Sequence, residues 1–187
     1  MSREKLEEKV NKGEEQKNSI FKELLEWLYV IVAAVAISLF LTFFVIVNAN
    51  VPTASMESTI MTNDRVMGFR LSYIFDSPKR GDIVIFKYPD DKDVLFIKRI
   101  IGMPGESVEI KSGVTYINGK ELKEPYLQVE PLGNFGPYVV PEGCYFMMGD
   151  NRNNSRDSRF WENTYLERDD IVGKAIFRYF PSIKMLD

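Results

Sequence analysis

The segment VLFIKRII, residues 94–101, is apolar except for one adjacent pair of cations. Side chains alternate between the two faces of a strand, so Lys98 shares a face with Phe96 and Ile100. Arg99 lies on the opposite face, which is otherwise apolar as well. We therefore predict a strand that is covered on both sides, where the charge of Lys98 is costly. The alternative is an edge strand whose lysine discourages aggregation.

Short β-type runs separated by turn residues follow one another from residue 65 to the end of the chain. Asn118-Gly119 is a strong hairpin signal, because both residues tolerate positive φ. The Lys-Ser-Gly turn at residues 111–113 indicates a second hairpin. The pattern predicts one all-β domain over residues 50–187, built from antiparallel sheets or a barrel-like arrangement. The runs are RVMGF (65–69), GDIVIFKY (81–88), SVEI (107–110), VTYI (114–117), YVV (138–140), CYFMM (144–148) and DIVGKAIFRYF (170–180).

Residues 27–49, WLYVIVAAVAISLFLTFFVIVNA, carry no charge. As a helix this run would be roughly 35 Å long, against about 30 Å for the hydrocarbon core of a bilayer. Trp27 and Tyr29 lie at one end, where amphipathic rings favour the level of the headgroups. We predict a single N-terminal transmembrane helix that anchors the domain and is preceded by a polar leader over residues 1–26.

Two other interpretations of the apolar run are a helix buried in a soluble core and a cleaved secretory signal. A cleaved signal has an apolar region of about 7–15 residues, which is shorter than this run, although VNA before Asn50 is a passable cleavage site. The leader holds six Lys and Arg residues, whereas the first basic residue after the run is Arg65. Basic residues favour the cytoplasmic side, so we expect the N-terminus in the cytoplasm and the domain outside the cytoplasmic membrane.

Composition excludes several classes of site. The 187 residues carry 24 Lys and Arg against 27 Asp and Glu, a net charge of −3 that does not suggest nucleic-acid binding. There is no histidine, and Cys144 is the only cysteine. An internal disulfide, a Cys-based zinc cluster, a His-containing metal site and a Ser-His-Asp triad are therefore excluded. We expect neither a metal nor a cofactor.

A serine follows the apolar run closely, in VNANVPTASMESTI, residues 47–60. If Ser55 is a nucleophile, a lysine is the obvious base in a chain without histidine. An ordinary lysine has a pKa of about 10.4 and becomes a base at neutral pH only where burial penalises its charge. Lys98, in its apolar strand, is the candidate.

GDNRNNSRDSRF, residues 149–160, is dense in Asn, Asp, Ser and Arg and is typical of a polar loop with Asx turns. A calcium loop has ligands at alternate positions, as this segment does, but it needs a glycine where this chain has Arg156. The third interpretation is a support shell for an active site. Ser155 would hydrogen-bond the lysine amine. Asp157 and Arg159 would brace the loop through a charge-assisted pair.

Four segments resemble, in order, the motifs of bacterial type I signal peptidases of the short Gram-positive type: PTASM (52–56), GDIVIF (81–86), FIKRIIGMPGE (96–106) and GDNRNNSRDSR (149–159). The resemblance covers nearly the whole chain, from the anchor to IVGKAIF at residues 171–177. It implies a membrane-bound serine endopeptidase with an all-β catalytic domain outside the cytoplasmic membrane. Its partners would be secretory preproteins with signal peptides and the lipid bilayer, and it would lie near the secretion translocon.

The resemblance also implies roles for individual residues. Ser55 would be the nucleophile and Lys98 the general base of a Ser/Lys dyad. Thr53 and the backbone amide of Ser55 would stabilise the oxyanion. The supporting residues would be Ser155, which orients the lysine, and Asp157 and Arg159, which hold their own motif in place. That motif, within residues 149–160, is called the third motif below, because GDIVIF carries none of the proposed site residues.

The implied reaction passes through an acyl-enzyme and removes signal peptides after small residues at the first and third positions before the scissile bond, as in Ala-x-Ala. Many members of the family have a proline where this chain has Ser58, which would alter a turn but not the chemistry. Shallow pockets for the small substrate side chains would be lined by Val51, Pro52, Met56, Phe96 and Ile97.

The alternative function is an anchored, non-catalytic β module that scaffolds other membrane proteins.

Overall fold

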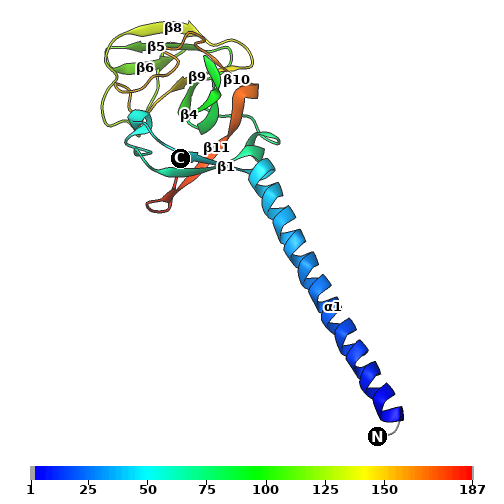
Figure 1. The fold of residues 1–187 in the computed structure, drawn as a ribbon. Coiled ribbons are helices and arrows are strands. Elements are labelled where there is room, and N and C mark those ends of the chain that lie inside the picture. The colour runs from blue at the N-terminus through cyan, green and yellow to red at the C-terminus, as the bar shows by residue number, and fades with distance from the viewer. Residues whose placement is uncertain (1–2, 187) are drawn as a thin grey trace. The chain divides into compact units, whose positions relative to one another are not determined.

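The computed structural model describes residues 3–186 of the chain, with side chains described from Ile20 onward. The chain divides after Phe43 into two compact units, one helical and one made of β-sheet. Each unit is described by itself below, and Figure 1 labels α1 and most of the longer strands.

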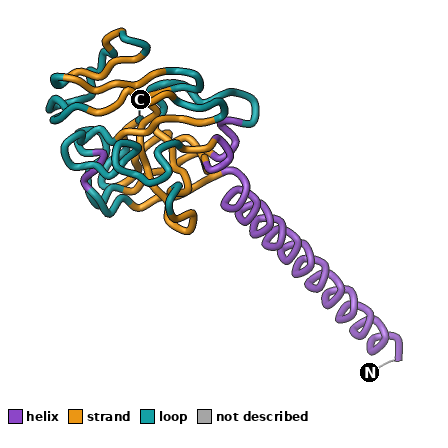
Figure 2. The backbone as a smooth tube through the Cα atoms, turned by 90° about the horizontal axis from the view of Figure 1, so that it is seen from above, coloured by secondary structure: helices purple, strands orange, loops and turns teal. Residues whose placement is uncertain are grey.

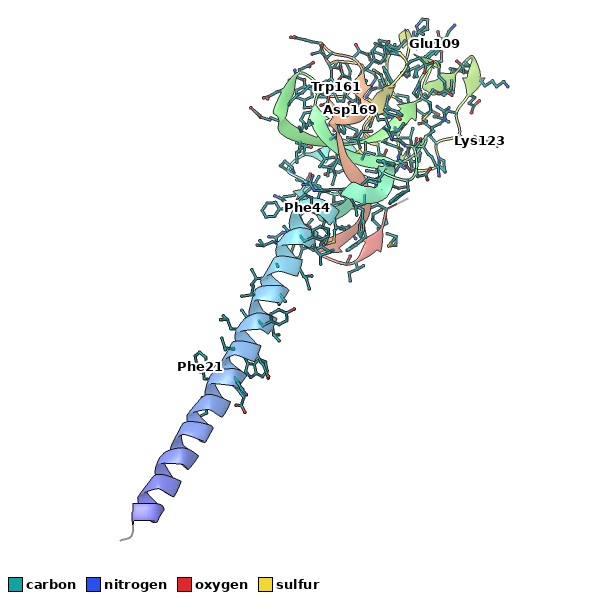
Figure 3. The ribbon with its side chains drawn as sticks, turned by 90° about the vertical axis from the view of Figure 1, so that its right-hand side faces the viewer. Phe21, Phe44, Glu109, Lys123, Trp161 and Asp169 are labelled. Carbon is teal, nitrogen blue, oxygen red and sulfur yellow. The ribbon has the colours of Figure 1, made fainter. Side chains whose placement is uncertain are left out.

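The helical unit is one long helix. α1 covers Arg3–Phe40 and runs through the predicted leader without a break, and a short π-helical stretch, η1, continues it over Leu41–Val45. Within the described residues, Ile20–Val45 is long and apolar enough to cross a membrane. Only 6% of its most apolar window is buried, and side chains such as Phe21 project from the helix (Figure 3). Its length and composition are therefore those of a helix that could span a membrane, as predicted.

The helical span ends earlier than the predicted anchor. The prediction extends to Ala49, whereas the helix ends at Val45, and Ile46–Asn50 form the strand β1. β1 pairs with β2, Arg65–Phe69, and so belongs to the β unit. β-Branched residues suit a helix in lipid and a strand in a sheet, and composition could not locate the point at which one becomes the other.

The described strands of the β unit pair only in antiparallel fashion and form two sheets. Figure 2 shows these strands in orange, joined by loops in teal. The larger sheet has the order β1-β2-β11-β3-β4-β9-β10, with β12 paired to β11, and the smaller has the order β7-β6-β5-β8. The predicted all-β class is therefore confirmed. The remaining strands are β3 (Ile83–Tyr88), β4 (Asp91–Gly102), β5 (Ser107–Lys111), β6 (Val114–Ile117), β7 (Lys120–Glu121), β8 (Phe135–Val139), β9 (Cys144–Met148), β10 (Leu166–Glu167), β11 (Ile171–Phe180) and β12 (Lys184–Met185).

Strand β4 lies inside the larger sheet, between β3 and β9. The edge-strand interpretation of Lys98 is therefore wrong. The strand is covered along only part of its length, because Asp91–Leu95 are exposed and Lys98–Gly102 are buried. β9 pairs with β4 only from Arg99 onward, so the outer end of β4 lacks a neighbour on that side. The predicted cover on both faces is confirmed for the half that carries the lysine.

Two hairpins of the smaller sheet turn on pairs of residues with positive φ. Ser112-Gly113, with φ of 51° and 82°, joins β5 to β6. Asn118-Gly119, with φ of 50° and 75°, joins β6 to β7. Two-residue loops of this kind match the twist of the strands that they connect. Both predicted hairpins are confirmed.

Three clusters of buried apolar side chains fill the β unit. One contains Met56 and Ile60, next to the candidate nucleophile. A second contains Trp161, which Figure 3 labels within the β unit. The third joins the two sheets near Gly102, where an added Cβ would come within 2.5 Å of the Val108 side chain. Glycine therefore permits the close approach of the sheets.

Candidate active site

Ser55 lies in a 3₁₀ turn, η2 (Ala54–Met56), a few residues after β1. Two backbone hydrogen bonds close the base of this loop. The Val51 N–H donates to the Asp64 carbonyl at 3.0 Å, and the Asn63 N–H donates to the Val51 carbonyl at 2.7 Å. The Ser55 side chain is thereby presented from a fixed turn, and the residue is only 8% exposed.

Residues at the start of the third motif, residues 149–160, contact the backbone of this turn. Asn151 donates its backbone N–H to the Ser55 carbonyl and its side-chain amide to the Ala54 carbonyl, both at 3.1 Å. Gly149 passes so close that an added Cβ would lie 2.3 Å from the Ser55 carbonyl oxygen. No supporting role for Asn151 or Gly149 could be predicted from the sequence, because such residues are common in any polar loop.

Lys98 brings its amine to the serine. Its Nζ lies 2.6 Å from Ser55 Oγ and donates a second hydrogen bond to the Ile97 carbonyl at 3.1 Å. Burial lowers the pKa of Lys98 to about 8, against the opposing effect of the Asp157 and Asp150 charges. With such a pKa about a tenth of the lysine is neutral at pH 7, far more than for an exposed lysine.

Aromatic rings exclude water from one side of the lysine. Nζ lies 5.1 Å from the centroid of the Phe96 ring. Phe96 stacks on Tyr88 with centroids 4.4 Å apart and planes 5° from parallel, and Trp161 packs edge-on against both. This cluster supplies much of the apolar surroundings that disfavour the charged amine.

Thr53 lies beside the candidate nucleophile. Its Oγ1 is 3.3 Å from Ser55 Oγ. The backbone of Thr53 is extended, with φ −123° and ψ 154°, just before η2 begins. The change from extended chain to 3₁₀ turn brings the two hydroxyls to one side. A hydroxyl in this position can donate to an oxyanion that forms at the carbon attacked by Ser55.

The third motif, residues 149–160, is a series of turns and not an extended segment. Asp157 is fully buried and accepts a hydrogen bond from the Gly149 N–H at 3.0 Å. Its two oxygens also accept from Arg159, at 2.8 and 2.9 Å. Arg159 donates in addition to the Arg152 carbonyl at 2.7 Å. This ion pair therefore links both ends of the loop.

Ser155 does not hydrogen-bond the lysine in this structure. It is buried, yet its Oγ has no hydrogen-bond partner among the described residues. The amine of Lys98 bonds Ser55 and Ile97 instead. The predicted contact between Ser155 and the lysine amine is therefore absent from this structure. Because the loop turns here, Ser155 Oγ faces Gly149, where an added Cβ would lie 2.3 Å from it.

A buried ion pair behind the dyad was not assigned from the sequence. The guanidinium of Arg99 donates to both oxygens of Asp150, at 2.9 and 2.8 Å, and lies 3.9 Å from the centroid of the Tyr126 ring. Asp150 also accepts from Thr59 Oγ1 at 2.5 Å. Thr59 follows η2, so Asp150 joins the nucleophile segment to β4. Only the position of Arg99 on an apolar strand could have indicated this pair, because a buried arginine requires a partner for its charge.

A cavity of about 250 Å³ opens beside Ser55 and Lys98. Within the described part of the chain, no group of three or more His, Cys, Asp and Glu side chains is placed to hold a metal ion. A serine, a buried amine and a neighbouring hydroxyl around one cavity are suited to acyl transfer. The lining, which includes all five predicted pocket residues, is Val51, Pro52, Thr53, Ala54, Ser55, Met56, Phe96, Ile97, Lys98, Asn154 and Arg156.

Comparison with known proteins identifies the family of this chain. The sequence matches the family described as Signal peptidase, peptidase S26 over residues 24–180. It is 39% identical over 166 residues to signal peptidase I of Leptolyngbya laminosa, covering 84% of this chain and 80% of that protein. It is 38% identical over 180 residues to signal peptidase I of Bacillus licheniformis, covering 91% of this chain and 94% of that protein.

A crystal structure of a signal peptidase I from Enterococcus faecalis shares 33% identity, with a TM-score of 0.47 over 53% of this chain and 97% of that chain. The family match covers most of this chain, and the two sequence relatives are similar along most of their length. The chain therefore belongs to the signal peptidase I family, a family of peptide-bond hydrolases.

Proposed function

We propose that this enzyme removes N-terminal signal peptides from secreted preproteins by a Ser/Lys mechanism, cutting after small residues of the Ala-x-Ala type. One observation carries the proposal: Lys98 Nζ lies 2.6 Å from Ser55 Oγ, at a site where both residues are buried. The lowered pKa of Lys98, about 8, makes a neutral amine accessible near physiological pH.

The reaction begins when neutral Lys98 accepts the proton of Ser55 and Ser55 Oγ attacks the carbonyl carbon of the scissile bond. The negative charge on the carbonyl oxygen is stabilised by Thr53 Oγ1 and the backbone N–H of Ser55. The protonated lysine then donates its proton to the leaving amine, and an acyl-enzyme remains. Lys98, neutral again, takes a proton from water, which attacks the carbonyl carbon of the ester. The bond between that carbon and Ser55 Oγ breaks, the protonated lysine returns its proton to Oγ, and the signal peptide is released with a free carboxylate.

The apolar wall of the cavity provides the substrate specificity in this proposal. Val51, Pro52, Met56, Phe96 and Ile97 all line the cavity next to Ser55. A space of about 250 Å³ that also holds peptide backbone leaves room for small side chains only. Precursors with alanine at the first and third positions before the cut are therefore the expected substrates.

The buried pair of Asp157 and Arg159 is proposed to keep the third motif in position behind the dyad. The two side chains are 0% and 1% exposed and bind bidentately. Ser155 is proposed as a supporting residue with an unpaired buried hydroxyl. The protonated amine of Lys98 has three N–H donors, and Ser155 is proposed to accept the one that is not directed at Ser55 Oγ or the Ile97 carbonyl.

Replacement of either dyad residue is expected to abolish cleavage. Ser55→Ala removes the nucleophile, and Lys98→Met removes the base but keeps an apolar stem of similar length. Detergent-purified variants are incubated with a secretory precursor that carries an Ala-x-Ala site, and products are separated on a gel. Lys111→Met, an exposed lysine on β5, serves as the control and should cleave like the wild type. Cleavage by folded Ser55→Ala or Lys98→Met would overturn the dyad, and cleavage by neither variant nor wild type would favour a non-catalytic scaffold.

The rate at low substrate concentration, kcat/KM, is expected to rise with pH and level off above about pH 8. The pKa of Lys98 is lowered to about 8 by burial, and only the neutral amine accepts a proton. Below that pKa the neutral fraction falls about tenfold per pH unit. Initial rates from pH 6 to 10, with circular dichroism at each pH to verify folding, measure this. A pH-independent rate, or an inflection near the pKa of an ordinary lysine, would contradict the assignment.

Thr53→Val is expected to lower kcat by about 100- to 1000-fold, the usual cost of losing one oxyanion donor. The substitution keeps the shape of the side chain and removes only the hydroxyl that lies 3.3 Å from Ser55 Oγ. KM should change little, because the charge arises only in the transition state. Thr53→Ser, which retains the donor, is the matched control. Rates of Thr53→Val within twofold of the wild type would exclude the role.

We propose that the apolar helix lies in the cytoplasmic membrane with its N-terminus in the cytoplasm, and that the β unit works outside, in contact with lipid and near the secretion translocon. In right-side-out membrane vesicles, added protease should digest a C-terminal tag and leave an N-terminal tag intact. The reverse pattern would refute the orientation. Site-directed photo-cross-linking from the β unit to translocon subunits tests the proximity.

A further inference from the structure

A second cavity, of about 400 Å³, adjoins the catalytic one. Asn154 and Arg156 line both cavities, so the segment 154–156 is a wall that they share. Asn153 fixes the far side of the second cavity. Its side chain accepts a hydrogen bond from the Leu132 N–H at 2.8 Å and donates one to the Glu130 carbonyl at 3.0 Å. The cavity is therefore built by two loops that are bonded to each other.

The lining of this second cavity combines exposed apolar surface with positive charge. Leu132 is 73% exposed and Phe160 is 52% exposed. Phe160 meets Phe135 edge to face, with ring centroids 5.4 Å apart. Three arginines also line the cavity. Of the three, Arg156 is exposed, whereas Arg152 and Arg159 are buried. Exposed apolar side chains beside an exposed cation suit a flexible polypeptide with mixed side chains.

One of the three arginines has no carboxylate partner in the part of the chain that the structure describes. Arg152 is paired with Glu124 and Arg159 with Asp157, both at close range. Arg156 is exposed and takes part in none of the ion pairs found among the described residues. Its guanidinium carbon lies 5.7 Å from the centroid of the Tyr88 ring, which orients it at the rim of the catalytic cavity.

We propose that the second cavity binds the first residues of the mature protein, those that follow the scissile bond, and that Arg156 gives the enzyme a preference for an acidic residue there. The inference rests on the proposed function. The wall formed by Val51, Pro52, Phe96 and Ile97 suits the small residues before the cut. The substrate residues after the cut have to leave Ser55 along another side of the catalytic cavity. The side lined by Asn154 and Arg156 is polar and adjoins the second cavity.

The expected effect follows from the exposure of Arg156. Exposed ion pairs change an equilibrium by about two- to fivefold, and the effect is screened by salt. Exchange of an acidic for a basic substrate residue replaces attraction by repulsion, so the rate ratio should be about fivefold or more at low ionic strength. One extended residue advances about 3.3 Å, so three positions after the cut extend about 10 Å from the scissile bond.

The test uses one precursor with an Ala-x-Ala site and Glu, Gln or Lys placed singly at the second position before the cut and at the three positions after it. Values of kcat/KM are measured for the full-length wild type, Arg156→Gln and Arg156→Glu in detergent. Lys120→Glu is the control, because it makes the same charge change at an exposed residue of β7 that lines neither cavity.

The wild type and Lys120→Glu should favour Glu over Lys after the cut, Arg156→Gln should lose the preference, and Arg156→Glu should invert it. Addition of 0.5 M salt should reduce all these ratios. An unchanged ratio in Arg156→Glu, or a charge effect confined to the position before the cut, would overturn the proposal. Cleavage of the Gln precursors with no charge dependence would overturn the subsite alone. Failure of the wild type to cleave any precursor would overturn the proposed function and the subsite together.

Discussion

A buried amine beside a serine is the constraint on which the rest of the active site depends. Lys98 is 3% exposed, and the carboxylates that raise its pKa are those of Asp157 and Asp150. Either carboxylate, if unpaired, would favour a protonated lysine. Each is instead bound bidentately by an arginine, Arg159 or Arg99. The arginines offset the field of the carboxylates, and desolvation remains the largest influence on the amine.

The same ion pairs assemble the site from three segments that are far apart in the chain. Asp150 binds β4 through Arg99 and the segment after η2 through Thr59. Asp157 binds the start of its own loop through the Gly149 N–H. Removal of one partner from a buried pair leaves an uncompensated charge and typically costs 3–5 kcal/mol. Electrostatic balance and loop geometry are thus set by one group of interactions.

Features that depend on neighbouring residues could be predicted from the sequence, and features that depend on a folded loop could not. The hairpin at Asn118-Gly119 and the all-β class follow from turn chemistry and strand-length runs. The role of Lys98 as the candidate base could be predicted because the chain has no histidine and because the strand around Lys98 is apolar. The partner of Arg99 and the unpaired hydroxyl of Ser155 depend on how a polar loop turns, and Asx-rich loops turn in many ways.

The absence of a linker between helix and sheet has a geometric consequence. β1 begins at Ile46, directly after the helical span ends at Val45, and Ser55 follows ten positions after Val45. Fully extended, ten residues reach no more than about 33–36 Å. Under the proposed placement of the helical span in a bilayer, this chain length limits how far Ser55 can lie from the membrane surface. A precursor held in the same bilayer by its own apolar segment would then have to expose its cleavage site within that distance, so spacing would restrict the substrates as well as side-chain size.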